Sequence, residues 1–176
     1  MQALKIMRNK SKAVIFVALV FCGNTNAGWL STQDKWEVKT ESSPGPLIQV
    51  DIPSQDGKKR AVFIAFEYAR KCDPIFSYAE IKGRSFGRPI SKKVLKNSKI
   101  GLVVNGNFHT SNAGLVTYDN GYEAGFGMPN SLVLQLLVAL DSFSYVAPSG
   151  DVIPLPRKDF KKSFLEAIEL CRQAIN

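Results

Sequence analysis

Apolar residues alternate with polar residues along most of the chain beyond residue 34, and this two-residue period is typical of half-buried β-strands. The strongest stretch is Ala61–Tyr68, whose two faces are both largely apolar, so we expect it in the interior of a sheet. Turn sequences rich in Gly, Pro, Asn and Asp separate the other runs. The pattern predicts these other strands at residues 35–39, 47–52, 74–82, 100–108, 115–118, 122–126, 143–147 and 152–155.

The stretch around Asn105-Gly106 has two interpretations. Every second residue from Ile100 to Phe108 is apolar or glycine, which predicts one continuous strand with Gly106 as a bulge. Asn-Gly is also a preferred two-residue hairpin turn, and in that case the chain would reverse there. In the continuous strand, His109 is out of phase with Phe108 and points to solvent or a groove.

Two segments have helical patterns. Residues 130–141 are apolar on nearly every side, which predicts a buried helix, with a partner-binding helix as the alternative. Residues 159–174 carry one apolar stripe at spacings of three or four, which includes Phe160, Phe164 and Cys171. The sequence therefore predicts an α+β fold, with a largely antiparallel sheet or sandwich of about seven to nine strands and these two helices.

The first 27 residues have the parts of a cleavable export signal. A basic leader without acidic residues precedes the apolar run Ala13–Cys22, and Thr25 and Ala27 are small residues at −3 and −1 of a cut before Gly28. Cleavage would leave residues 28–176 as a single globular domain in the periplasm or outside the cell. A lipoprotein acylated at Cys22 is the alternative, and Phe21 argues against it because such signals have a small residue before the cysteine.

Two of the three cysteines, Cys72 and Cys171, belong to the predicted mature chain. An even pair in an exported protein predicts a disulfide. The position of Cys171 on the apolar stripe fits a bond that pins the last helix to the end of the Ala61–Tyr68 strand. Two buried free thiols, or a reactive Cys72 activated by Arg70 and Lys71, are the alternatives.

Charge is concentrated in one segment. The four leader cations account for part of the formal charge of +8, and the mature chain carries about +4. Residues 82–99 contain seven cations and no acidic residue, with a loop expected first and a short helical turn at 91–97. This segment is either a solvated loop or a docking surface for an acidic protein or an anionic membrane. Nucleic acid is an unlikely partner, because Phe86 is the one aromatic residue there. The predicted partner-binding residues are Arg84, Arg88, Lys92, Lys93 and Lys96.

No catalytic signature is present. His109 is the one histidine in the chain, which argues against a multi-histidine metal site. No nucleophile elbow, P-loop or dinucleotide-binding pattern occurs, and the spacing of the carboxylates selects no acid–base pair. We therefore predict no catalytic residue, no metal and no cofactor. A small periplasmic hydrolase would require a Ser, Thr or carboxylate within hydrogen-bond reach of His109.

These features favour an exported bacterial envelope protein that acts by protein–protein binding without catalysis. It would serve as an accessory of a secretion or conjugation apparatus, as an immunity protein that blocks a toxin, or as a host-directed factor. An early strand with a tryptophan, a β-rich middle and a last amphipathic helix with a cysteine resemble several families of small bacterial envelope proteins, including invasion-associated ones. The resemblance is one of architecture and carries over no site residue.

Cleavage of the leader gives the first testable prediction. The exported protein should have the intact mass of a chain that begins at Gly28, because signal peptidase accepts small residues at −3 and −1. Ala27→Phe supplies an uncleaved reference for the mass measurement. An exported wild-type species that retains residues 1–27 would contradict the prediction.

Overall fold

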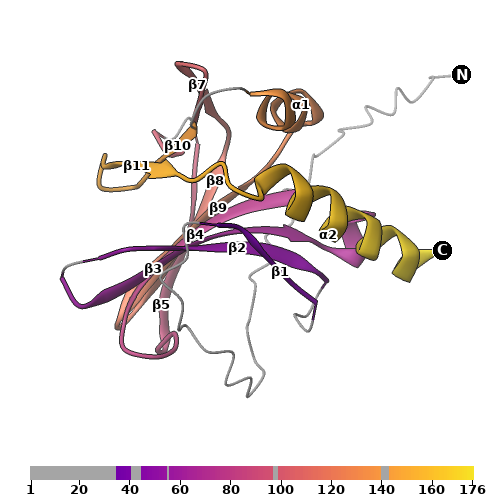
Figure 1. The fold of residues 1–176 in the computed structure, drawn as a ribbon. Helices are drawn as coiled ribbons and strands as arrows, with labels where there is room; N and C mark the ends of the chain where they lie inside the picture. The colour runs from indigo at the N-terminus through magenta and orange to yellow at the C-terminus, as the bar shows by residue number, and fades with distance from the viewer. Residues whose placement is uncertain (1–34, 41–44, 55, 97–98, 140–142) are drawn as a thin grey trace, which may run out of the picture.

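The computed structural model describes residues 35–40, 45–54, 56–96, 99–139 and 143–176, which form an α+β fold of two antiparallel sheets and two α-helices (Figure 1). This confirms the predicted fold class. The seven-stranded sheet has the order β1 (Glu37–Lys39), β2 (Leu47–Ile52), β3 (Lys58–Phe66), β4 (Pro74–Lys82), β9 (Gly121–Gly127), β8 (Ala113–Tyr118), β5 (Pro89–Leu95). The four-stranded sheet has the order β11 (Val152–Leu155), β10 (Phe143–Val146), β6 (Gly101–Val104), β7 (Asn107–Thr110). The helices are α1 (Asn130–Val138) and α2 (Phe160–Ile175), and a short 3₁₀ helix, η1 (Tyr68–Arg70), follows β3.

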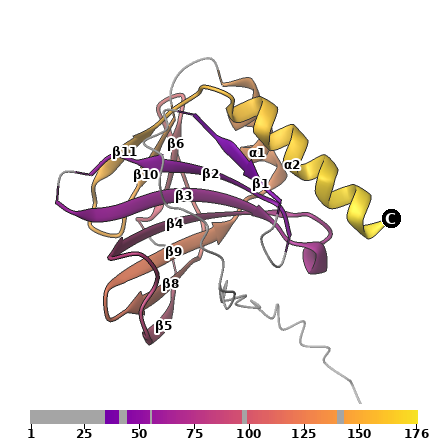
Figure 2. The same cartoon turned by 60° about the horizontal axis from the view of Figure 1, so that its bottom comes forward.

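The main hydrophobic core lies between the two sheets and beneath the helices. Aromatic rings join the layers: Tyr78 of β4 stacks on Tyr145 of β10, with 4.9 Å between ring centroids. Phe66 of β3 packs edge-on against Phe164 of α2 at 5.0 Å. Figures 1 and 2 show α2 lying alongside β1 and β2, at the opposite end of the seven-stranded sheet from β5.

Trp36, directly before β1, ties the start of the described chain to its end. Its ring is buried, and its Nε1–H donates a hydrogen bond to the Pro156 carbonyl over 2.8 Å. The Ser163 hydroxyl of α2 donates to the Trp36 carbonyl over 3.0 Å. The indole also packs edge-on against Phe160, with 5.2 Å between centroids. These contacts satisfy the polar atoms of a buried tryptophan and hold α2 against the sheet.

Cys72 and Cys171 form the predicted disulfide, with an Sγ–Sγ distance of 2.11 Å and Cα atoms 5.9 Å apart. Cys72 follows η1 and is buried, and Cys171 is fully buried on the core-facing side of α2. The bond joins the turn between β3 and β4 to α2 across a sequence separation of 99 residues.

The prediction of one continuous strand through Gly106 is wrong, and the alternative hairpin is confirmed. Asn105 and Gly106 form the turn between β6 and β7, with φ of 49° and 78°, as the favoured two-residue turn requires. His109 pairs with Leu102, whose side chain lies in the core, so His109 shares that inner face. Phe108 is the outward residue, with 47% of its surface exposed. The expected outward orientation of His109 is therefore corrected.

Helix α1 is buried along one face rather than on all sides. Leu132 and Leu136 are in the core, whereas Leu134 and Val138 are 62% and 68% exposed. A helix of this length placed at the surface of a sandwich has contact with the core on one side. Among the described residues, no helix has the length and apolar character needed to span a membrane.

The disulfide makes a stability prediction. Cys72→Ala combined with Cys171→Ala should lower the free energy of unfolding by about 3–5 kcal/mol, because the unfolded chain regains the freedom of a long loop. Urea denaturation of the mature protein measures the change, and wild type in reductant should lose a similar amount. Thiol labelling of denatured, unreduced protein should find no free thiol, and two labelled cysteines would contradict the bond.

Candidate functional site

The helical turn predicted at residues 91–97 is wrong, because Pro89–Leu95 forms strand β5, paired antiparallel with β8. Leu95 lies opposite Ala113, and both pack on the main core. Ile90 and Val94 are β-branched and suit an extended chain. Tertiary pairing with β8 therefore decides the conformation of a segment whose lysines and leucine are compatible with a helix.

The strand sends its lysines to opposite sides of the sheet. Lys93 shares the core-facing side with Leu95, whereas Lys92 lies on the other side together with Val94, and Ile90 lies in a β-bulge between Pro89 and Ser91. Both lysines are exposed, and Ile90 and Val94 are 63% and 43% exposed. The outward side of β5 therefore carries Lys92 and Val94, and the exposed Ile90 lies in the bulge before them.

The loop before β5 carries Arg84 and Arg88 and is held by the turn between β8 and β9. The Asp119 carboxylate accepts a hydrogen bond from the backbone N–H of Arg88 over 3.1 Å. Asn120 accepts one from the Gly87 N–H over 2.7 Å and donates to the Ser85 carbonyl over 2.8 Å. These three backbone groups thus have fixed partners, and the two arginines flank a defined loop.

Phe86 anchors the same loop from inside. Its ring lies 4.5 Å from that of Tyr118, and it packs on a small second cluster that includes Phe63, on the side of the large sheet away from the main core. A Cβ on Gly87 would overlap the Asp119 carboxylate, so a larger residue here would displace the side chain that accepts from the Arg88 N–H. The loop is consequently a packed structure that presents its arginines outward.

The five predicted partner-binding cations have no acidic partner within salt-bridge distance in the part of the chain that the structure describes. The described ion pairs involve cations on or directly before β1 and on β3, namely Lys35, Lys39, Lys58 and Arg60. The structure brings Arg88, Lys92 and Lys93 onto or beside one strand, with Arg84 in its leading loop and Lys96 directly after it. We call these five cations with Ile90 and Val94 the β5 surface.

Sequence analysis missed Ile90 and Val94 as members of this surface. The signal was present in their spacing, because Ile90, Lys92 and Val94 fall at every second position. The prediction of a helical turn at residues 91–97 left this two-residue spacing unused.

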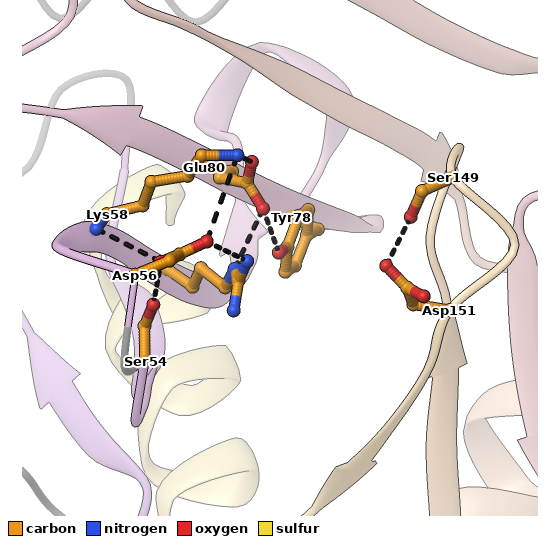
Figure 3. A network of polar contacts seen from close by, with 8 residues as sticks. Ser54, Asp56, Lys58, Tyr78, Glu80, Ser149 and Asp151 are labelled. Carbon is orange, nitrogen blue, oxygen red and sulfur yellow. Dashed lines mark hydrogen bonds and ion pairs between the residues drawn. The ribbon is translucent and has the colours of Figure 1, made fainter.

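A second polar cluster surrounds Glu80, on the core-facing side of β3 and β4 (Figure 3). Lys58 Nζ and Arg60 Nε lie 2.6 Å and 2.8 Å from the two oxygens of the Glu80 carboxylate. The Tyr78 hydroxyl donates to the same carboxylate over 3.2 Å. Arg60 also pairs with Asp56 at 2.8 Å.

The electrostatics of this cluster indicate a structural role. Burial works against the charged form of Glu80, yet the hydrogen bonds from Lys58 and Arg60 outweigh it and lower the pKa of Glu80. Burial raises the pKa of Tyr78, so its hydroxyl keeps its proton at neutral pH. A carboxylate with two cations and a hydroxyl donor is saturated and has little capacity to accept a substrate proton.

Glu123 of β9 lies on the opposite side of the sheet from Glu80, so the two carboxylates form no acid–base pair. Their backbone positions show this: Glu80 pairs with Tyr122, and Glu123 pairs with Ala79. Burial raises the pKa of Glu123 to about 7, although the Ser77 hydroxyl donates a hydrogen bond to its carboxylate. Of these two carboxylates, Glu123 is therefore the one that changes charge near neutral pH.

His109 Nε2 is buried and has no hydrogen-bond partner within the described ranges, so no Ser, Thr or carboxylate there bonds to this nitrogen. No group of three His, Cys, Asp or Glu residues in those ranges could hold a metal ion.

No family model, no curated protein and no solved structure matches this chain.

The raised pKa of Glu123 predicts a pH-dependent stability. Because the pKa of Glu123 is about 7 in the folded protein, against the usual 4.5 of a glutamate, the stability that its protonated form contributes is complete below pH 4.5 and is lost as the pH rises to about 7. Glu123→Gln should therefore gain stability relative to wild type between pH 5 and pH 8, by roughly 1–3 kcal/mol. Urea titrations at several pH values measure this difference. Exposed Glu166→Gln is the control, and a difference that stays constant with pH would contradict the assignment.

Proposed function

We propose that this protein is exported and acts without catalysis, by binding an acidic protein in the envelope or outside the cell through the β5 surface. The observation that carries the proposal is that Arg84, Arg88, Lys92, Lys93 and Lys96 have no acidic partner among the described residues. Unpaired charge of one sign attracts an oppositely charged partner over distances of about 10 Å at moderate salt.

Apolar groups on the same surface add short-range affinity. Ile90 and Val94 flank Lys92, and both are exposed. Burial of apolar side chains supplies most of the binding free energy at protein interfaces, whereas charge sets the encounter rate and the choice of partner. The combination favours a protein partner over a purely electrostatic one such as an anionic membrane.

Export is part of the same proposal. The disulfide between Cys72 and Cys171 is compatible with an oxidising periplasmic or extracellular location. The predicted signal, residues 1–27, and Cys22 of the lipoprotein alternative lie outside the described residues. A role in a secretion or conjugation apparatus, in toxin immunity or toward a host each involves such a protein partner.

A site-specific cross-link tests the proposal. Benzoylphenylalanine in place of Ile90 should form an adduct with an acidic protein in intact bacteria. The triple variant Lys92→Glu, Lys93→Glu, Lys96→Glu should reduce this adduct about tenfold or more, because it reverses the attraction. Lys158→Glu, Lys161→Glu, Lys162→Glu changes the same amount of charge at exposed positions near α2 and should leave the adduct intact.

Three results would contradict the proposal. They are the absence of an adduct from position 90, an adduct that survives the triple reversal, and a cross-linked protein without an acidic surface. The membrane alternative would be favoured instead if the purified protein bound phosphatidylglycerol vesicles as strongly as it binds in cells, and if high salt abolished this binding.

A further inference from the structure

We infer that the partner binds by adding an extended acidic strand to the open edge of β5, so that the large sheet continues into the partner. This inference rests on the proposed function and specifies its geometry. Strand addition uses backbone hydrogen bonds for affinity and alternate side chains for specificity. The argument depends on the edge, on the direction of its backbone groups and on its charge.

Strand β5 is the most accessible edge in the described part of the chain. Four strands end the two sheets, and β5 has seven residues, against three in β1 and four each in β7 and β11. Helix α2 packs against β1, and Pro154 lies inside β11, whereas the proline of β5, Pro89, is its first residue. Figure 2 shows β5 as the outermost strand of its sheet. A long, uncovered edge strand is a template for pairing with another chain.

The pairing of β8 with β9 shows in which direction the backbone groups of β8 point. Tyr118 and Gly121 flank the two-residue turn at Asp119 and Asn120, so they form a hydrogen-bonded pair between β8 and β9. The backbone N–H and C=O groups of the odd-numbered residues of β8 must then point to β5. The backbone N–H of Asp119, which donates to the Arg88 carbonyl over 3.1 Å, agrees with this phase.

The partners of these odd-numbered residues on β5 are Ser91 and Lys93, whose backbone groups therefore point to β8. The N–H and C=O groups of Lys92 and Val94 consequently point to the open edge. An added strand can form its hydrogen bonds with these two residues without breaking any bond of the existing sheet.

Charge selects the occupant of this edge. A second copy of the chain would place the lysines of one β5 beside those of the other, and like charges on neighbouring strands are destabilising. An acidic strand reverses the sign of the same interaction. The lysines thus prevent self-association and favour an acidic strand at one and the same edge.

The side chains of β5 specify the sequence that fits best in antiparallel register. The residues opposite Val94, Lys93, Lys92 and Ser91 would be valine, glutamate, glutamate and threonine, in that order, and a further valine follows where the bulge carries the exposed Ile90. Both glutamates then meet a lysine, and the first valine meets an exposed apolar side chain.

A synthetic peptide tests the inference directly. The probe is this five-residue sequence with threonine added at each end and both termini blocked, and the control has the same composition with the glutamates moved to the ends. We expect the probe to bind the oxidised full-length mature protein with a Kd of about 1 mM or lower, and about tenfold more tightly than the control. The amide protons of Lys92 and Val94 should exchange more slowly with the probe bound, while those of Ser91 and Lys93 serve as internal references.

A backbone variant separates strand addition from side-chain docking. Val94→Pro removes an N–H that faces the open edge, a position where a sheet accepts proline, and retains every charge. It should weaken probe binding about tenfold, whereas Val94→Thr retains the N–H and should stay within about threefold of wild type. Thermal unfolding of both variants verifies that the sheet is intact.

The outcomes distinguish this inference from the function on which it rests. Probe binding without slower exchange at Lys92 and Val94, or equal binding by the two Val94 variants, would overturn strand addition. Failure of the probe to bind more tightly than its control would also overturn it. In each of these cases, the cross-link from position 90 and its loss in the triple variant still test the proposed function independently.

Discussion

The alternation of side chains along an extended chain is the constraint on which this structure depends. The central strands of the large sheet send every second residue into the main core, as Val62, Tyr78 and Ala124 do in one row across β3, β4 and β9. A change of phase by one residue exchanges the two sides of a strand. The hairpin at Asn105-Gly106 is such a change, and it turns His109 inward and Phe108 outward.

The same alternation distributes charge over the molecule. On β3 and β4 it brings Lys58 and Arg60 to Glu80, where the charges neutralise one another in a partly buried network. On β5 it places Lys92 and Lys93 on opposite sides of a strand with no acidic neighbour within the described ranges. Within the described ranges, Glu37, Asp56 and Glu80 thus pair with cations of β1 and β3, whereas the cations of the β5 surface have no acidic partner within salt-bridge distance, and the proposed binding function rests on this difference.

The end of the sheet opposite β5 is the most firmly fixed. The disulfide, the buried Trp36 and its hydrogen bonds to Pro156 and Ser163 join α2 to the strands at that end. At the β5 end, Phe86, Asp119 and Asn120 hold the leading loop. For the proposed strand addition, an edge strand supported in this way needs little reordering, which lowers the entropy cost of binding.

The sequence by itself determined features that depend on local pattern. Period-two runs marked β2 and β4, a stripe at spacings of three and four marked α2, and an even cysteine pair marked the disulfide. The basic character of residues 82–99 was equally visible in the composition. These features survive because the local preference and the final contacts agree.

Only the tertiary structure decided the features in which two local preferences compete. Residues 89–95 suit a helix or a strand, and pairing with β8 selects the strand. Helix α1 is apolar all round, and the small area available on the core leaves Leu134 and Val138 outside. Glu123 resembles any other carboxylate in the sequence, and its burial beside Ser77 makes it titrate near pH 7. Such properties arise from neighbours that are distant in the sequence, so no local pattern contains them.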